Sequence, residues 1–219
     1  GVVRTVEDAL LEPLSWRKPR RVFVNSMSDL FHEDVPDEFI LQVIDVIRRC
    51  QRHTFQVLTK RPKRMRDFCC RLRFDPGSVR STRAGGLWLV NGPAIGDVDR
   101  QSDGNTAVGF TRHLKWLWLG VSVENQRFAD QRIPLLAEAG AAVKFLSCEP
   151  LLGPVDLDEW LQADCTACNG IGEFYLTPST SWTCQCNGGY AWPGVDWVIA
   201  GGESGPKARP CEYEWLRSL

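Results

Sequence analysis

Three acidic residues of the sequence share one pattern, in which a short apolar run ends in a small residue and a carboxylate follows two positions later. The pairs are Ser122 and Glu124, Ser147 and Glu149, and Gly201 and Glu203. Side chains two positions apart on a strand point to the same face, so each run is predicted to present both residues on one side. Carboxylates bind cations, amines and hydroxyl groups, and the small residues leave space for a ligand. We interpret the three acids as candidates for catalysis.

A cation is expected among these acids, because neighbouring carboxylates repel one another and raise one another's pKa. Lys60 and Arg61 follow another apolar run and are the candidates within the chain, besides a metal ion or a cationic group on a ligand. Lys60 therefore joins the three acids as a predicted catalytic residue. No histidine stands beside the acids, which disfavours a carboxylate–histidine metal site. The alternative is that each acid caps the helix that follows or pairs with a surface cation.

The first apolar run, residues 21–27, also ends in hydrogen-bonding groups. Asn25 shares the parity of Phe23 and Met27, and Asp29 continues it. These residues are predicted to lie at the same strand ends as the acids. The predicted cofactor-binding residues are Asn25, Ser26, Asp29, Ser122, Ser147, Gly201 and Gly202.

Four cysteines form two close pairs with fifteen residues between the pairs. They are Cys165, Cys168, Cys184 and Cys186. Four thiolates at this spacing are typical of a tetrahedral structural zinc site, and an iron–sulfur cluster is the main alternative. The odd total of nine cysteines, several of them isolated, argues against a secreted disulfide framework. We therefore expect reduced thiols and a cytoplasmic protein.

Apolar runs and amphipathic runs alternate along the chain. Strands are predicted at 21–27, 54–60, 116–123, 143–149 and 196–204, and the helices between them at 37–50, 62–73 and 126–139. This alternation predicts right-handed crossovers and a parallel sheet, in an α/β fold whose ligands bind at the C-terminal ends of the strands. Periodicity does not distinguish an open doubly wound sheet from a closed barrel.

The 219 residues are predicted to form one barrel-like domain, interrupted by insertions at 74–113 and 156–192. Both ends of the chain fall within apparent helices, so we expect it to be truncated at both ends. The formal net charge of −1 does not favour nucleic acid as a partner. Basic runs at 16–21 and 59–68 nevertheless leave a phosphate or nucleic-acid contact open, beside the simpler reading as solvated surface. No apolar run reaches the ~20 residues of a membrane span.

Five segments carry a resemblance to a known family: RVFVNSMSDLFHEDVP, VLTKRPKRM, WLGVSVENQ, FLSCEPLLGPVDL and DWVIAGGESGPKARP. They closely resemble an uncharacterised family encoded by phages and prophages, which itself resembles radical S-adenosylmethionine (SAM) enzymes. The resemblance implies a parallel (β/α)6-type partial TIM barrel that binds SAM. It also implies a [4Fe–4S] cluster held by a three-cysteine motif before the first strand, and no C-x3-C-x2-C motif occurs in this sequence.

The resemblance carries over to strand-end positions, which are Asn25, Ser26, Asp29, Lys60, Glu124, Glu149, Gly201, Gly202 and Glu203. The Gly-Gly-Glu triplet resembles the one that contacts the SAM amino group in radical SAM enzymes. It lies on the last strand rather than an early one, so that role is not transferred.

We therefore expect a radical-SAM-like enzyme whose fragment is inactive alone, with a polar and nucleic-acid-derived substrate. Two alternatives stay open. One is a non-catalytic zinc-containing module that binds nucleic acid or protein, and the other is a carboxylate metal-dependent hydrolase.

Overall fold

The computed structural model describes residues 3–25, 27–74, 87–89, 114–161, 173–177, 180–183 and 194–219. Five strands form one all-parallel sheet in the order β1–β2–β5–β6–β9. Their bounds are Arg21–Val24 for β1, Thr54–Thr59 for β2, Leu117–Ser122 for β5, Val143–Cys148 for β6 and Trp197–Ala200 for β9. The predicted parallel α/β sheet is confirmed.

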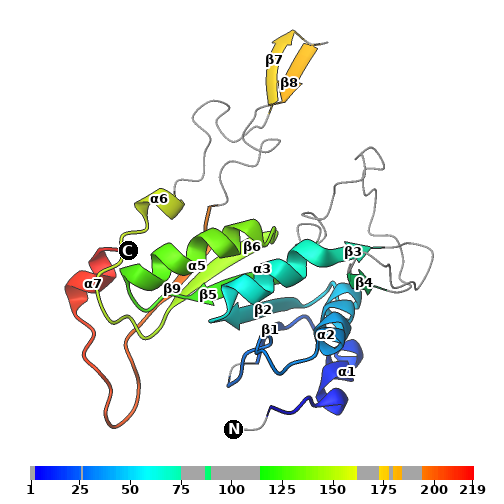
Figure 1. Cartoon of the computed structure of the whole chain (residues 1–219), viewed down its shortest axis with the longest axis horizontal. Coiled ribbons are helices and arrows are strands. Elements are labelled where there is room, and N and C mark those ends of the chain that lie inside the picture. The colour runs from blue at the N-terminus through cyan, green and yellow to red at the C-terminus, as the bar shows by residue number, and fades with distance from the viewer. Residues whose placement is uncertain are drawn as a thin grey trace.

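The order of the strands in the sheet is the same as their order along the chain. A doubly wound sheet reverses its order at a switch point, and this reversal puts helices on both faces. Without a reversal, right-handed crossovers place the connecting helices on one face. Figure 1 shows the sheet curled into a half-barrel, with α2, α3 and α5 along its outer face. This architecture is consistent with a partial TIM-like barrel.

The helices that cover the sheet begin and end where local chemistry favours it. Their bounds are Asp37–Arg49 for α2, Pro62–Arg71 for α3 and Gln126–Glu138 for α5. Acidic residues in the first turn of α2 and basic residues in its last turn complement the helix dipole. Pro62 suits the first position of α3. The Asn125 side chain accepts a hydrogen bond from the Phe128 N–H at the start of α5, and Gly140 follows its end at a φ of 68°.

Three further helices lie at the ends of the chain and after β6. They are α1 at Glu7–Ser15, α6 at Asp158–Leu161 and α7 at Tyr213–Arg217. α1 packs beside α2, next to the β1 side of the sheet (Figure 1). Among the described helices, none combines the length and the apolar character that a membrane crossing requires.

The two faces of the sheet differ in burial. The outer face packs against the helices and forms the core, with Phe55, Val57 and Leu119 almost completely buried. The inner face carries the alternate residues, and Phe23 on β1 and Trp197 on β9 expose 40% and 53% of their surface there. The sheet thus leaves its concave face open at both edges.

β1 ends three residues earlier than the sequence predicted. Asn25, directly after Val24, has a φ of 60°, which breaks the extended conformation and which asparagine tolerates better than most residues. The Ser28 N–H then donates to the Asn25 carbonyl oxygen in a turn. The polar residues at 25–29 therefore belong to a loop and not to the strand.

Four short strands fall within the predicted insertions. β3 at Leu72–Phe74 pairs in parallel with β4 at Leu87–Leu89, and β7 at Glu173–Thr177 forms an antiparallel hairpin with β8 at Thr180–Thr183. The four cysteines of the predicted zinc site lie outside the described residues.

The inner face contains one close approach that a substitution can test. A β-carbon on Gly120 would lie 2.5 Å from the ring of Phe145, a fully buried residue of the neighbouring strand. We expect Gly120→Ala to lower the free energy of unfolding by about 1–3 kcal/mol, because the ring has to shift. Gly153→Ala is the control, since its nearest neighbour would be 3.8 Å away. Equal urea-denaturation midpoints for the two variants would contradict the packing described.

Candidate ligand-binding site

The register of the parallel strands brings the predicted site residues to one edge of the sheet. Ser122 on β5 stands beside Ser147 on β6, which stands beside Ile199 on β9. Residues two positions further on share the same face, so Glu124, Glu149 and Gly201 lie along the C-terminal edge of the inner face. Lys60 reaches the same edge from β2, where Leu58 stands beside Gly120. The predicted parity of these residues therefore agrees with the register.

Glu124 is the most buried of the three acids, with 8% of its side chain exposed, and it lies between two cations. Lys60 Nζ donates to one carboxylate oxygen at 2.6 Å. Arg132, from α5, donates to the other oxygen at 2.9 Å and also to the Ser122 carbonyl oxygen at 2.7 Å. The cation expected among the acids is thus present in the chain itself.

The ionisation of Glu124 follows from these partners. Burial raises the pKa of its carboxyl, but the hydrogen bond from Lys60 and the charges of Arg132 and Lys60 outweigh burial. The net effect holds the pKa below its ordinary value near 4.5. Glu124 is therefore a carboxylate at neutral pH and does not serve as a proton donor there.

Asp29 holds the loop after β1 against the end of β2. Its two oxygens accept hydrogen bonds from the Thr59 hydroxyl at 2.8 Å, the Lys60 N–H at 3.0 Å and the Arg61 guanidinium at 3.0 Å. Phe31 N–H donates to it as well, at 2.9 Å. The structure thus gives Asp29 a positioning contact with the backbone of Lys60.

Glu149 differs from the other two acids because its side chain is exposed and makes no ion pair with a described residue. It lies across from Gly201, which directly follows the neighbouring strand β9, and a β-carbon on Gly201 would come within 2.6 Å of the carboxylate. Cys148, the residue before it, is buried on the other face. Burial, with smaller contributions from Glu124 and Glu149, raises the pKa of the Cys148 thiol to about 12. This thiol is therefore protonated and is not a nucleophile.

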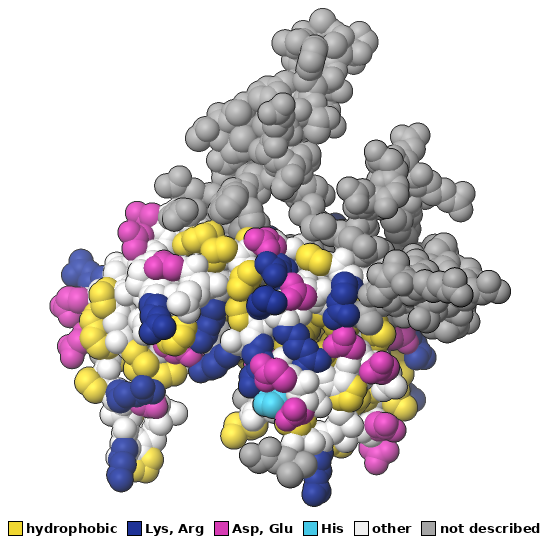
Figure 2. All heavy atoms as spheres, viewed as in Figure 1, with side chains coloured by type: hydrophobic (Ala, Val, Ile, Leu, Met, Phe, Trp, Pro, Cys, Tyr) yellow, Lys and Arg dark blue, Asp and Glu magenta, His cyan; other side chains and the backbone are white. Residues whose placement is uncertain are grey.

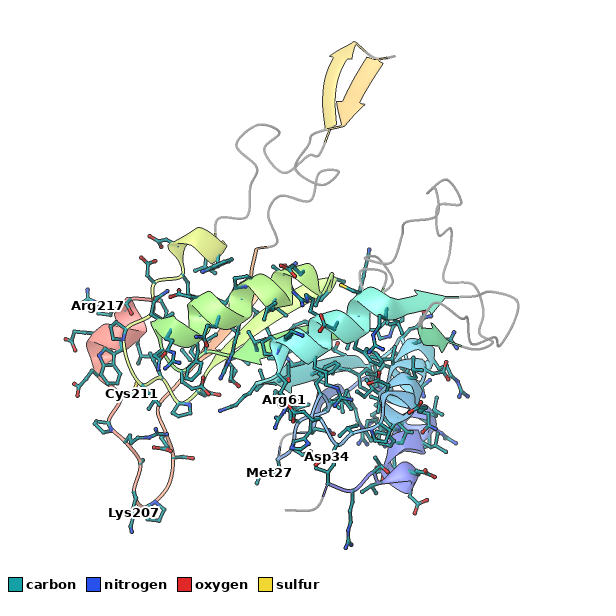
Figure 3. The ribbon with its side chains drawn as sticks, in the orientation of Figure 1. Met27, Asp34, Arg61, Lys207, Cys211 and Arg217 are labelled. Carbon is teal, nitrogen blue, oxygen red and sulfur yellow. The ribbon has the colours of Figure 1, made fainter. Side chains whose placement is uncertain are left out.

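Glu203 lies three residues beyond β9, in the loop 201–212. It accepts two hydrogen bonds from the Arg209 guanidinium, at 2.8 and 3.0 Å, and one from the Arg209 N–H at 2.9 Å. These bonds lower the pKa of the Glu203 carboxyl to about 2. The pair joins the two arms of a loop that projects from the sheet and carries Lys207 at its tip (Figure 3). Glu203 thus has its partner within its own loop.

The small residues of the predicted set lie below the acids or in loops. Ser122 and Ser147 are buried, and Asn25 is exposed after β1. Gly202 approaches Cys211, whose β-carbon would be 3.1 Å from a β-carbon on the glycine. Ser26 lies outside the described residues.

A cavity of about 1,230 Å³ opens along β1 and reaches the C-terminal edge. Its apolar wall comes from α1, β1 and α2. Its polar lining comes from the strand ends and the loops after them, and includes Asn25, Asp29, Lys60, Arg61 and Ser122. Glu149 is not part of this lining, so the acid without an ion pair and the cavity are separate parts of the same edge.

Each cation of the basic run at 59–68 lies beside at least one carboxylate. The pairs are Lys60 with Glu124, Arg61 with Asp29 and Glu33, Lys63 with Asp67, Arg64 with Asp37, and Arg66 with Asp67 and Glu138. Figure 2 shows basic and acidic side chains interleaved over α3 and the segment before α2. This surface does not form the uniform basic patch that a nucleic-acid backbone requires.

Two residues that matter to the electrostatics were not predicted. Arg132 lies among the buried residues Ala129, Ile133 and Leu136 of α5, and a cation on an apolar helix face was the signal available in the sequence. Arg209 lies in the loop 201–212 and interacts electrostatically with Glu124 as well as with Glu203. No signal in the sequence paired Arg209 with either acid.

The family model of DUF5131, a protein family of unknown function, matches residues 1–219, so the chain belongs to this family. Searches of curated proteins and of solved structures found no match. The family description assigns no activity to the chain.

The buried position of Glu124 predicts a stability effect. Glu124→Gln leaves Arg132 without its carboxylate, so we expect the free energy of unfolding at pH 7 to fall by about 1–3 kcal/mol, less than for a fully buried pair because Lys60 is half exposed. The folded-state pKa lies below the ordinary value near 4.5, so the contribution is present above pH 4.5 and is lost as the pH falls through the lower, folded value.

Urea unfolding at pH 7 and pH 3 measures this difference, which is expected to be smaller at pH 3. Glu138→Gln is the control, because Arg66 is the one ion-pair partner of Glu138 among the described residues and the Glu138 side chain is 57% exposed. Equal urea midpoints for the two variants at pH 7 would show that the ion pairs of Glu124 stabilise the fold no more than an exposed surface ion pair does.

Proposed function

We propose that the C-terminal edge of the half-barrel binds a small polar molecule with a cationic group, as part of a radical-SAM-like enzyme. SAM is the compound that the resemblance of the sequence implies. The observation that carries the proposal is Glu149, an exposed carboxylate at the ligand-binding edge of a parallel sheet. Gly201 beside it allows the carboxylate to lie close to the backbone, because a β-carbon at this position would be 2.6 Å from a Glu149 oxygen.

The charges at this edge single out Glu149. Glu124 is compensated by Lys60 and Arg132, and Glu203 is compensated by Arg209. Glu149 makes no ion pair with a described residue, so it is free to accept hydrogen bonds from a ligand. SAM carries an ammonium and a sulfonium group, and either would supply the missing positive charge.

The residues present fit SAM better than they fit an iron–sulfur cluster. The described residues contain no group of three or more histidine, cysteine or acidic side chains placed to hold a metal ion, and the sequence has no three-cysteine cluster motif. The described residues therefore do not supply ligands for a cluster. What its own residues supply is a binding edge in which Glu149 holds the cationic group and Asp29 fixes the backbone at Lys60.

The two alternative functions have less support. A carboxylate metal-dependent hydrolase needs acids that are free to share a metal ion, and two of the three acids are held by arginines. A nucleic-acid-binding module needs several free cations along one surface, and Arg61, Arg64 and Arg66 of the basic run are ion-paired. A nucleic-acid-derived substrate and a cytoplasmic location remain part of the proposal on the strength of the sequence.

SAM binding is tested by calorimetric titration of the purified chain. We expect SAM to bind the unmodified protein and Glu149→Gln to weaken that binding by at least about tenfold, because a charge-assisted hydrogen bond is lost. Glu214→Gln, on the exposed side of α7, is the matched control and should leave affinity unchanged. The proposal fails if SAM does not bind, or if Glu149→Gln and Glu214→Gln bind it equally.

We also propose that Cys165, Cys168, Cys184 and Cys186 hold one structural zinc ion, on the basis of their spacing in the sequence. Elemental analysis of the purified protein should find about one zinc per chain, and the double change Cys165→Ser and Cys184→Ser should remove it. Cys211→Ser is the control and should retain the metal. Iron in place of zinc would identify the alternative cluster, and the absence of both metals would refute the site.

A further inference from the structure

We infer that Lys60 binds an oxyanion, a phosphate or a carboxylate, of a ligand whose apolar or aromatic body occupies the cavity along β1. The inference rests on the proposed function and adds to it the chemical class of the substrate. Glu124 shares one negative charge between two cations, Lys60 at 2.6 Å and Arg132 at 2.9 Å. The three side chains together therefore carry a net charge of about +1.

This excess positive charge is accessible at Lys60. Its side chain is 56% exposed, whereas those of Glu124 and Arg132 are only 8% and 11% exposed. An ammonium group has three N–H donors, and the described structure gives the Nζ of Lys60 one acceptor, the Glu124 carboxylate. Two donors of a half-exposed cation are thus available to a ligand.

Lys60 also lines the cavity, and the charges around that cavity are mainly positive. Three of the charged side chains in its lining are cations and one is an anion: Arg4, Lys60, Arg61 and Asp29. Asp29 is already engaged by Arg61, Thr59 and the Lys60 backbone, so it does not cancel the charge at Lys60 Nζ. Glu33, the second partner of Arg61, lies outside the cavity lining and is 68% exposed.

The rest of the cavity specifies the other part of the ligand. Its wall below the polar rim includes Phe23 and Leu58 from the inner face, and its volume of about 1,230 Å³ exceeds the range of about 300–1,000 Å³ typical of small-molecule pockets. Asn25, Ser28 and His32 add hydrogen-bonding groups to the lining. The cavity thus has room for a nucleotide-sized body with its oxyanion on Lys60.

The oxyanion subsite is distinct from the position proposed for the cationic ligand. Lys60 lies at the end of β2 and Glu149 at the end of β6, with β5 between them. Neighbouring parallel strands are about 4.8 Å apart, so the strand ends that carry Lys60 and Glu149 are about 10 Å apart across the edge. This spacing allows a cationic ligand on Glu149 and an anionic substrate on Lys60 to be bound together.

The test compares ligands that differ in the oxyanion, using ligand-observed NMR or calorimetry on the full 219-residue chain. The probes are adenosine 5′-monophosphate, adenosine and octanoate. We expect the monophosphate to bind at least about tenfold more tightly than adenosine, and Lys60→Gln to remove that difference. Lys63→Gln is the matched control, because Lys63 belongs to the same basic run but pairs with Asp67 and lies outside the cavity lining.

Several outcomes separate the possibilities. Octanoate binding that depends on Lys60, without a preference for the monophosphate over adenosine, would keep the oxyanion subsite and assign it to carboxylates. The inference would be overturned if the monophosphate and adenosine bound equally and octanoate showed no binding that depends on Lys60. It would also be overturned if Lys60→Gln and Lys63→Gln had an equal effect on ligand affinity.

Failure of this inference can be distinguished from failure of the proposed function. SAM affinity reports on the Glu149 position, whereas the preference for the monophosphate over adenosine reports on Lys60. Loss of SAM binding alone would refute the proposed function while the oxyanion subsite stands. Loss of monophosphate binding alone, with octanoate also unbound, would refute the subsite while the proposed function stands.

Discussion

The parallel pairing of β5 and β6, with Ser122 beside Ser147, is the constraint on which the rest of the edge depends. It sets Glu124 and Glu149 side by side in register, one strand spacing apart and on one face. A shift of the strand register by one residue would turn the side chain of one acid toward the helices on the outer face. Because all five strands are parallel, each places its C-terminal end at this edge. Because they follow one another in chain order, the connecting helices stay on the other face.

Charge compensation then gives each acid a different state. Glu124 is buried but has Lys60 and Arg132, so its ionised form is favoured despite the loss of water around it. Glu203 has Arg209 in an exposed loop, where solvent weakens the contribution of the pair to stability. Glu149 is exposed and makes no ion pair within the described chain. Three residues with the same sequence pattern thus occupy three electrostatic environments.

The sequence predicted the strands and helices, and the face of the sheet on which each site residue lies, better than it predicted the ion-pair partners of these residues. Parity is local, because two residues of one strand determine it, and this is why the shared face of Glu124 and Glu149 could be predicted. The partner of Glu124 on α5 could not, since Arg132 reaches the acid only through the packing of the helix on the sheet. The strand order also depends on long-range pairing, so periodicity left barrel and doubly wound sheets open. The early end of β1 depends on the left-handed conformation of Asn25, which apolar patterning does not encode.

Burial across the sheet explains why the most buried ion pair, Glu124 with Arg132, lies at the end of β5. β5 is buried at five of its six residues and β6 at four of its six, whereas Phe23 on β1 and Trp197 on β9 are exposed at the two edges. A charge pair is stronger where less water surrounds it, so the Glu124 carboxylate at the end of β5 interacts with its cations more strongly than an edge residue would. Ligands bound at Lys60 and at Glu149 would flank this central strand and would cover Glu124 further. Binding at this edge is therefore expected to strengthen the ion pairs that already organise it.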